Sequence, residues 1–294
     1  MKSLGSTRIG GIILALALAL GLSACSAIKL GYNSLPNLAF FWLDGYVDFS
    51  DEQQPLVRDE LVRLHAWHRQ EELPRVLELL VRMEQMAPGE LTAQQACAVV
   101  AEVRVRLNAV AEQAAPRAIA IASSFTGREL RYLSRKFRRK NEQFQQEWVA
   151  IPTAERLEKR FQKMVERLET FYGRLEEPQR AVVRQRLAQS VYDPARTAVE
   201  WQRRQADLME VLHRLTAPRG VPEAEGRALL RGWLARIEQA PDPAYRAYQE
   251  ALLQEGCTTV AAVHQGTSAA QREQAVNRLR TYQRDVRELA SQQP

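Results

Sequence analysis

The side chains best suited to binding a metal lie between residues 65 and 72. His65, His68 and the pair Glu71–Glu72 follow at spacings of three and four, which brings a histidine and a glutamate side by side on a helix. Zinc sites need three or four supported ligands, and the other histidines, His213 and His264, are far along the chain. His68 also lies on the apolar face of its predicted helix. We therefore favour hydrogen-bonded histidines at the edge of a core, with a metal site at His65 and His68 as the alternative.

Other reactive motifs are missing from the sequence. It contains no glycine-rich phosphate loop, no G-x-S-x-G elbow and no cysteine–histidine pair at a suggestive spacing. Carboxylates occur on too many helix faces for a glycosidase pair to be singled out. The sequence therefore predicts no catalytic residue, no cofactor and no enzymatic activity. The alternative is a hydrolase of envelope material that draws its ligands from separate helices.

The first 24 residues have the three parts of a secretory signal. Lys2 and Arg8 supply positive charge, Ile12–Leu22 is apolar, and small residues lead into Cys25. The apolar run is shorter than the ~20 residues of a membrane-spanning helix. A cleaved signal peptide, residues 1–24, is therefore predicted.

The residues at the end of this signal, Leu22–Cys25 (LSAC), resemble the lipobox of bacterial lipoproteins. The resemblance implies acylation (palmitate) of the Cys25 sulfur, whose thiolate is a strong nucleophile, and a lipid anchor that does not release. Ser26 follows, and resemblance to enterobacterial sorting then implies the outer membrane, facing the periplasm. A plain secreted protein is the alternative.

The two remaining cysteines, Cys97 and Cys257, can form only one bridge. Disulfides persist outside the cytoplasm, so this pair is a candidate disulfide. Two separately buried thiols are the alternative, because sequence does not show whether the two Cα atoms approach.

The charge balance is mixed. The chain has 41 Lys and Arg against 35 Asp and Glu, and its net charge falls from +6 to +4 when Lys2 and Arg8 are removed. We expect no nucleic-acid partner. One basic stretch, residues 128–140, is a candidate for binding the anions of lipid headgroups, lipopolysaccharide or glycans; a solvated helix face is the alternative. Its candidate binding residues are Arg128, Arg131, Arg135, Arg138 and Arg139.

Apolar residues recur at spacings of three and four throughout the chain, which predicts amphipathic helices. No stretch alternates with period two. We predict an all-α protein, an antiparallel bundle of long amphipathic helices. After an aromatic-rich tether at 25–49, one helical domain spans 50–294. Breaker residues predict helices at 50–86, 92–115, 117–148, 153–174, 176–191, 194–216, 222–239, 243–255 and 268–290.

Several predicted helices begin with the same local pattern. Ser50, Thr92 and Ser268 each precede a Gln by three residues, and Glu176 precedes Gln179. Helix capping is sufficient to explain this pattern: the first side chain caps the helix, while the Gln side chain accepts a hydrogen bond from the backbone N–H of the capping residue. Residues 91–95 (LTAQQ) also resemble the LTxxQ motif of small periplasmic stress chaperones.

The segment 32–72 is rich in aromatic residues. It contains Tyr32-Asn33, Phe40–Asp44 and Trp67-His68-Arg69, and with the lipobox it resembles a family of proteobacterial lipoproteins known as a domain of unknown function. The resemblance implies a class and a location but no activity. The rings of residues 38–47 belong either to one end of the core or to the membrane surface. We expect a non-enzymatic lipoprotein that binds an envelope protein partner, with a lipopolysaccharide or glycan binder as a further alternative.

Overall fold

The computed structural model describes residues 28–292, and in this range every regular element is a helix. The prediction of an all-α fold is confirmed. The elements are α2 (Leu35–Val47), α3 (Gln53–Trp67), η1 (His68–Glu72), α4 (Leu73–Met86), α5 (Ala93–Ser123), α6 (Gly127–Phe144), η2 (Gln145–Val149), α7 (Thr153–Tyr172), α8 (Glu177–Ala188), α9 (Pro194–Leu215), α10 (Glu223–Glu238), α11 (Pro243–Gln265) and α12 (Ala269–Ser291).

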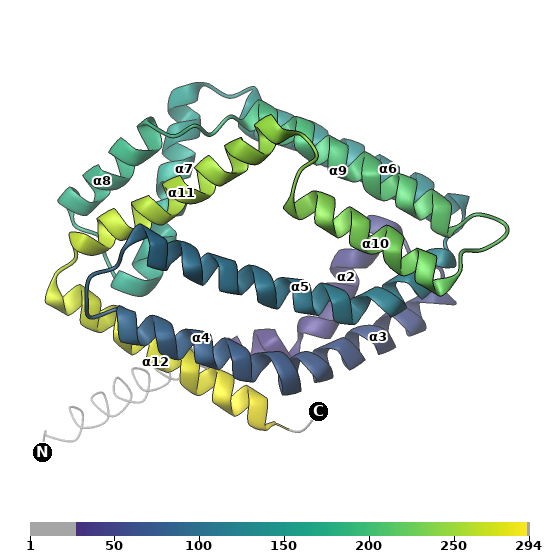
Figure 1. The fold of residues 1–294 in the computed structure, drawn as a ribbon, viewed down its shortest axis with the longest axis horizontal. Helices are drawn as coiled ribbons and strands as arrows, with labels where there is room; N and C mark the ends of the chain where they lie inside the picture. Colours follow the sequence, from purple (N-terminus) through teal and green to yellow (C-terminus); the bar gives the residue numbers. More distant parts are fainter. Residues whose placement is uncertain (1–27, 293–294) are drawn as a thin grey trace, which may run out of the picture.

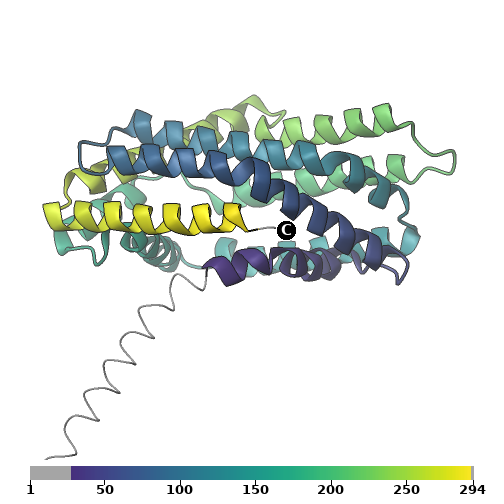
Figure 2. The ribbon, with the colours of Figure 1, turned by 90° about the horizontal axis from the view of Figure 1, so that it is seen from below.

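The helices form a flat molecule. Seen down its shortest axis, most helices run round the outside, while α5 passes through the middle beside α10 and α11 (Figure 1). The last helix, α12, lies along α4. The view from below shows the flattening, with α2 along one broad face (Figure 2).

Buried apolar side chains form three clusters. The largest joins α7, α8, α11 and α12 around Phe161, Val183 and Val263. The second joins the end of α5 to α6 and α9 around Leu133 and Leu212. The third packs α2 on α3. Helix α5 adds buried residues to the second cluster through its last turns, but none to the largest one.

The break predicted at Pro116 is wrong, because α5 continues through this proline to Ser123. Burial of Ala115, Ile119 and Ala122 against neighbouring helices outweighs the lost backbone hydrogen bond and the ring clash. The boundary falls ten residues later, where Thr126 and Glu129 form a capping box at the start of α6. The Thr-x-x-Glu pattern is the sequence signal for this boundary.

The predicted helix end at residue 255, just before Gly256, is also wrong. Helix α11 runs through it to Gln265, because continuing the helix buries Cys257, Ala261 and Val263. The helix ends at Gly266, just before the next capping box.

Pro74 lies inside the first predicted helix, 50–86, where a proline ring favours a kink. Instead a π-helical turn, η1, precedes it, and the N–H of Leu73 bonds to the carbonyl of His68, five residues back. Pro74 lies in the first turn of α4. The wider turn accommodates a proline ring that would otherwise meet the carbonyl four residues back.

The predicted capping boxes are confirmed at Thr92, Glu176 and Ser268, and Ser50 exchanges the same two bonds with its Gln. Two of these glutamines also join helix ends. The Gln179 amide donates to the carbonyl of Gly266 and bonds to the Gln271 side chain. Capping residues therefore also fix how α8 and α12 meet.

The N-terminal part of the chain is helical where it is described. Residues 28–33 form a helical turn, and α2, inside the expected tether, packs on α3 and α6. The predicted signal peptide and Cys25 lie outside the described residues. Between residues 28 and 292, no helix is long and apolar enough to span a bilayer.

Candidate functional site

An apolar cleft lies where α4, α5, α7, α11 and α12 meet. Its volume is about 460 Å³, within the range of ligand sites. Aliphatic, aromatic and methionine side chains make up most of its lining. The lining residues are Met83, Met86, Ala87, Leu91, Ala96, Val99, Val100, Met164, Arg167, Leu168, Phe171, Tyr172, Leu252, Leu253, Gly256, Cys257, Val260, His264, Ala275 and Leu279.

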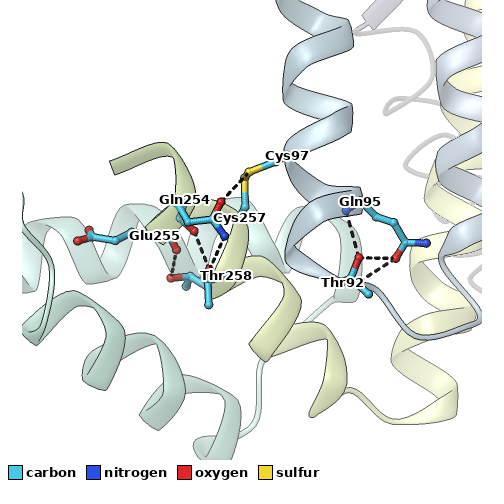
Figure 3. The surroundings of a disulfide bond; sticks show 8 residues. Thr92, Gln95, Cys97, Gln254, Glu255, Cys257 and Thr258 are labelled. Atoms are coloured by element: carbon cyan, nitrogen blue, oxygen red, sulfur yellow. Dashed lines mark hydrogen bonds between the residues drawn. A yellow bond between two sulfur atoms is a disulfide. The ribbon is translucent and has the colours of Figure 1, made fainter. Parts of the chain in front are cut away.

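A disulfide holds one wall of this cleft in place. Cys97 near the start of α5 is bonded to Cys257 in the middle of α11, with the Cα atoms 5.4 Å apart (Figure 3). The Thr92–Gln95 capping box lies one turn away at the first residue of the same helix (Figure 3). The bond ties the first half of α5 to α11, along which it also packs.

Three of the chain's five methionines line the cleft, namely Met83, Met86 and Met164. Unbranched and polarisable, methionine fits apolar partners of different shapes and is frequent at adaptable binding surfaces. All three are partly exposed.

The polar side chains at one end of the cleft bond to each other. The Tyr172 hydroxyl lies 2.8 Å from Nδ1 of His264, and Nε2 of His264 lies 2.8 Å from the carbonyl oxygen of Gly89. Burial raises the pKa of Tyr172 to about 12 and lowers the pKa of His264. Both groups are therefore uncharged near neutral pH.

An exposed apolar stripe on α5 extends from the cleft. Val103 is 41 % and Leu107 63 % exposed. They follow Ala96 and Val100 at spacings of four, three and four and so share their helix face. The apolar periodicity predicts that this stripe packs against a neighbouring helix, but in the structure it is uncovered.

A second candidate region is polar and buried, where the two ends of the described chain meet η1. The Arg69 guanidinium donates to the carbonyl of Leu289 (2.9 Å), to Oε1 of Gln292 (3.0 Å) and to Oδ1 of Asn33 (2.7 Å). Lys29 forms an ion pair with Glu288 at 2.5 Å. We call this region the junction. It fixes residues 28–33 to the end of α12.

The histidines predicted as possible metal ligands lie in the junction. The Tyr32 hydroxyl is 3.0 Å from Nδ1 of His68, and the Tyr32 ring packs 4.5 Å from the ring of His65. Burial lowers the pKa of both histidines. Within residues 28–292, no three His, Cys, Asp or Glu side chains are grouped closely enough to hold a metal ion.

Glu72 and Asp285 are the fully buried carboxylates near this region. Glu72 forms ion pairs with Arg75 at 2.7 Å and with Arg106 at 3.7 Å. Asp285 has no hydrogen-bond partner for either oxygen among the described residues, and burial raises its pKa.

A model of the family of unknown function DUF6279 matches residues 45–246 of the chain. The chain belongs to this family. The sequence-based resemblance to a domain of unknown function is thereby confirmed. The DUF6279 match contains α3 to α10 complete. No curated protein and no solved structure matches the chain.

The predicted basic residues of this DUF6279 protein all lie on α6 and are exposed: Arg128, Arg131, Arg135, Arg138 and Arg139. Arg128 contacts the backbone and carboxylate of Asp48. Of the five, Arg128 is the one that contacts the end of α2, whereas Arg138 lies beside α9 in a hollow with Gln205 and Met209. None of them lines the apolar cleft.

Sequence analysis did not find the cleft. Its lining comes from five helices, and each contributes residues that have ordinary core periodicity. Met83 and Met86 lie close together in the sequence, but Met164 joins them only in the folded chain. Asp285 was also missed, because a carboxylate on an amphipathic helix normally faces solvent.

Proposed function

We propose that this protein is a lipid-anchored lipoprotein of the bacterial envelope that binds an apolar segment of a partner protein and catalyses no reaction. The observation that carries the proposal is the apolar, methionine-lined cleft with its uncovered extension along α5. Stable helical proteins recognise partners mainly through such apolar grooves.

The geometry favours an amphipathic helix as the bound segment. Val100, Val103 and Leu107 are exposed along about two turns of α5, which matches the spacing of the apolar anchors on a partner helix. An exposed apolar row of this length on one helix is also typical of interaction sites. Adaptable methionines would allow partners of more than one sequence.

The cleft is less suited to acid–base catalysis. Its ionisable groups are Arg167, Tyr172 and His264. Tyr172 and His264 bond to each other, and His264 also bonds to the backbone of Gly89. A general acid or base needs a free position toward a substrate, and these two side chains use their polar atoms on one another.

The proposed location rests on the sequence. The charged start, the apolar run and Leu22–Cys25 (LSAC) together support cleavage before Cys25 and its acylation. Ser26 supports export to the outer membrane, with the helical domain facing the periplasm. Replacing Cys25 by Ser would then abolish acylation and membrane recovery, which membrane fractionation and mass spectrometry measure.

Site-specific photocrosslinking in the native host tests the binding function. A photoreactive amino acid placed at Val100 or Leu107 is expected to give protein adducts. The matched control is Val199 on α9, which is also exposed and apolar (68 %) but lies outside the cleft. Equal labelling from Val199 and Leu107, or adducts only with lipopolysaccharide or glycan, would contradict the proposal.

A further inference from the structure

Helix α2 has two apolar faces, and only one is covered. Phe40 and Val47 are buried in the third core cluster. On the other side Leu38 is 55 %, Phe41 64 % and Trp42 63 % exposed. One face of this aromatic segment therefore belongs to the core, and the other face remains uncovered.

The uncovered apolar surface continues toward the start of the described chain. Leu30 and Leu35 are exposed as well, and Ile28 is only three residues after Cys25. Three residues span at most about 10 Å. If Cys25 is acylated, the start of this surface cannot lie farther than that from the lipid.

Basic side chains of α6 lie beside α2. The Trp42 ring stacks on the Tyr46 ring at 4.8 Å, and the Lys136 ammonium lies 5.2 Å from the centre of the Tyr46 ring. Lys136 is followed on its helix face by Arg139 and Lys140, both exposed. Cations therefore flank the exposed rings.

The two carboxylates at the end of α2 are already engaged. Asp44 accepts a hydrogen bond from the N–H of Phe49 at 3.0 Å, and Asp48 forms an ion pair with Arg128 at 3.5 Å. Although burial acts to raise it, hydrogen bonds from Thr126 and Arg128 lower the pKa of Glu129 to about 2. Asp48 and Glu129 are therefore ionised and neutralise Arg128. Lys136, Arg139 and Lys140 form no ion pair with a carboxylate among the described residues, so this side of α6 is positively charged.

We infer that the exposed face of α2 and the basic side of α6 form one docking surface for anionic phospholipid headgroups. Phe41 and Trp42 lie at headgroup depth, where aromatic rings are favoured, and the α6 cations face lipid phosphates. The inference rests on the proposed function only for the anchor at Cys25, and it is independent of the cleft. Docking through this surface would fix the orientation of the anchored protein relative to the membrane, because α2 packs on α3 and α6.

Photocrosslinking of the full lipidated chain tests this surface in vesicles of phosphatidylethanolamine and phosphatidylglycerol. A photoreactive residue at Phe41 is expected to give at least fivefold more lipid adduct than one at Val199, which is equally exposed. The yield at Phe41 should fall severalfold when phosphatidylcholine replaces phosphatidylglycerol.

A charge reversal at Lys136, Arg139 and Lys140 should lower the Phe41 yield to a similar extent. A matched reversal at three exposed arginines elsewhere, Arg104, Arg186 and Arg219, should leave it unchanged, and circular dichroism verifies that both variants are folded. Lipid labelling at Phe41 no stronger than at Val199, or a yield indifferent to phosphatidylglycerol, overturns the inference. In whole cells, Phe41 adducts only with protein or lipopolysaccharide also overturn it.

The same samples separate this inference from the proposed function. Failure of the anchor appears as an N-terminal peptide without acyl chains in mass spectrometry. Failure of the cleft appears as missing protein adducts at Val100 and Leu107 while Phe41 still labels lipid.

Discussion

The cleft and the junction depart from the usual distribution of side chains in opposite ways. At the cleft, α5 carries apolar residues that remain exposed. At the junction, Arg69, Glu72 and Asp285 are buried. One region leaves apolar surface uncovered, and the other encloses charge. Each departure costs stability, so each points to a requirement other than folding.

The two regions also differ in what holds them together. The first half of α5 is joined to α11 by a covalent bond, Cys97–Cys257, and to α4 by the ion pair of Glu102 with Arg82. The junction is fixed by hydrogen bonds of Arg69 to three separate segments of the chain. The junction thereby joins residues 28–33 to η1 and to the end of α12.

The largest effect is expected from removing the disulfide with Cys97→Ser and Cys257→Ser together. The bond closes a loop of 160 residues, for which the chain-entropy model gives a loss of up to about 5 kcal/mol in the free energy of unfolding. Urea unfolding measures this loss, and hydrogen exchange should rise first in residues 93–114. Reductant should reproduce the effect in the natural chain and have none in the variant. Free thiols at both positions in periplasmically expressed protein would show that the bond does not form.

The next largest effect is expected at the junction. Arg69→Ala removes charged hydrogen bonds to Leu289, Gln292 and Asn33 and should cost roughly 3 kcal/mol in urea unfolding. It should also expose residues 28–33 to proteolysis. Arg63→Ala, at an exposed pair on α3, should cost less than about 0.5 kcal/mol. Similar costs at the two positions would mean that the junction is not a fixed connection.

Most of the fold could be predicted from sequence because its signals are local. The stripe Leu157, Phe161, Met164, Leu168 and Phe171 predicts a helix, and all five side chains belong to the largest core cluster or pack against it. The Ser/Thr-x-x-Gln pattern predicts three helix starts for the same reason.

The candidate site could not be predicted to the same extent because it depends on distant contacts. Periodicity shows that Val103 and Leu107 share a helix face, but not whether a neighbour covers it. Pro116 was misread because burial of Ile119 and Ala122 overrides a local rule. The histidines at 65 and 68 suggested metal, yet their partner Tyr32 comes from another helix.

A smaller effect is expected from pH. Burial lowers the pKa of His65, His68 and His264 in the folded state, so the unfolded chain binds more protons as the pH falls below about 6.5. Stability should therefore be constant above that pH and decrease below it. Thermal unfolding between pH 8 and 5.5 measures the decrease, which should shrink in His68→Asn, with His213→Asn as the control for losing an exposed histidine.

Asp285 contributes to the pH dependence of stability with a sign opposite to that of the histidines. The experiment must therefore separate the two contributions. Because burial raises the pKa of Asp285, its folded form holds a proton longer than the unfolded one, and stability is lost as the pH rises through the raised value. Asp285→Asn should remove this contribution and stabilise the protein at neutral pH. A melting temperature that rises steadily from pH 8 down to 5.5 in that variant would contradict the assignment to the histidines.

The smallest effect on stability, and the most informative for function, is expected on the α5 stripe. Leu107→Ala removes a side chain that is 63 % exposed, so it should change the free energy of unfolding by less than about 0.5 kcal/mol. Leu168→Ala makes the same chemical change at a side chain that is 6 % exposed, and it should cost about 2 to 5 kcal/mol. If the stripe binds a partner, Leu107→Ala should nevertheless lower the yield of protein adducts from a photoreactive residue at Val100. A loss of several kcal/mol in Leu107→Ala would mean that the stripe is core, covered in solution, and would remove the basis for the proposed binding.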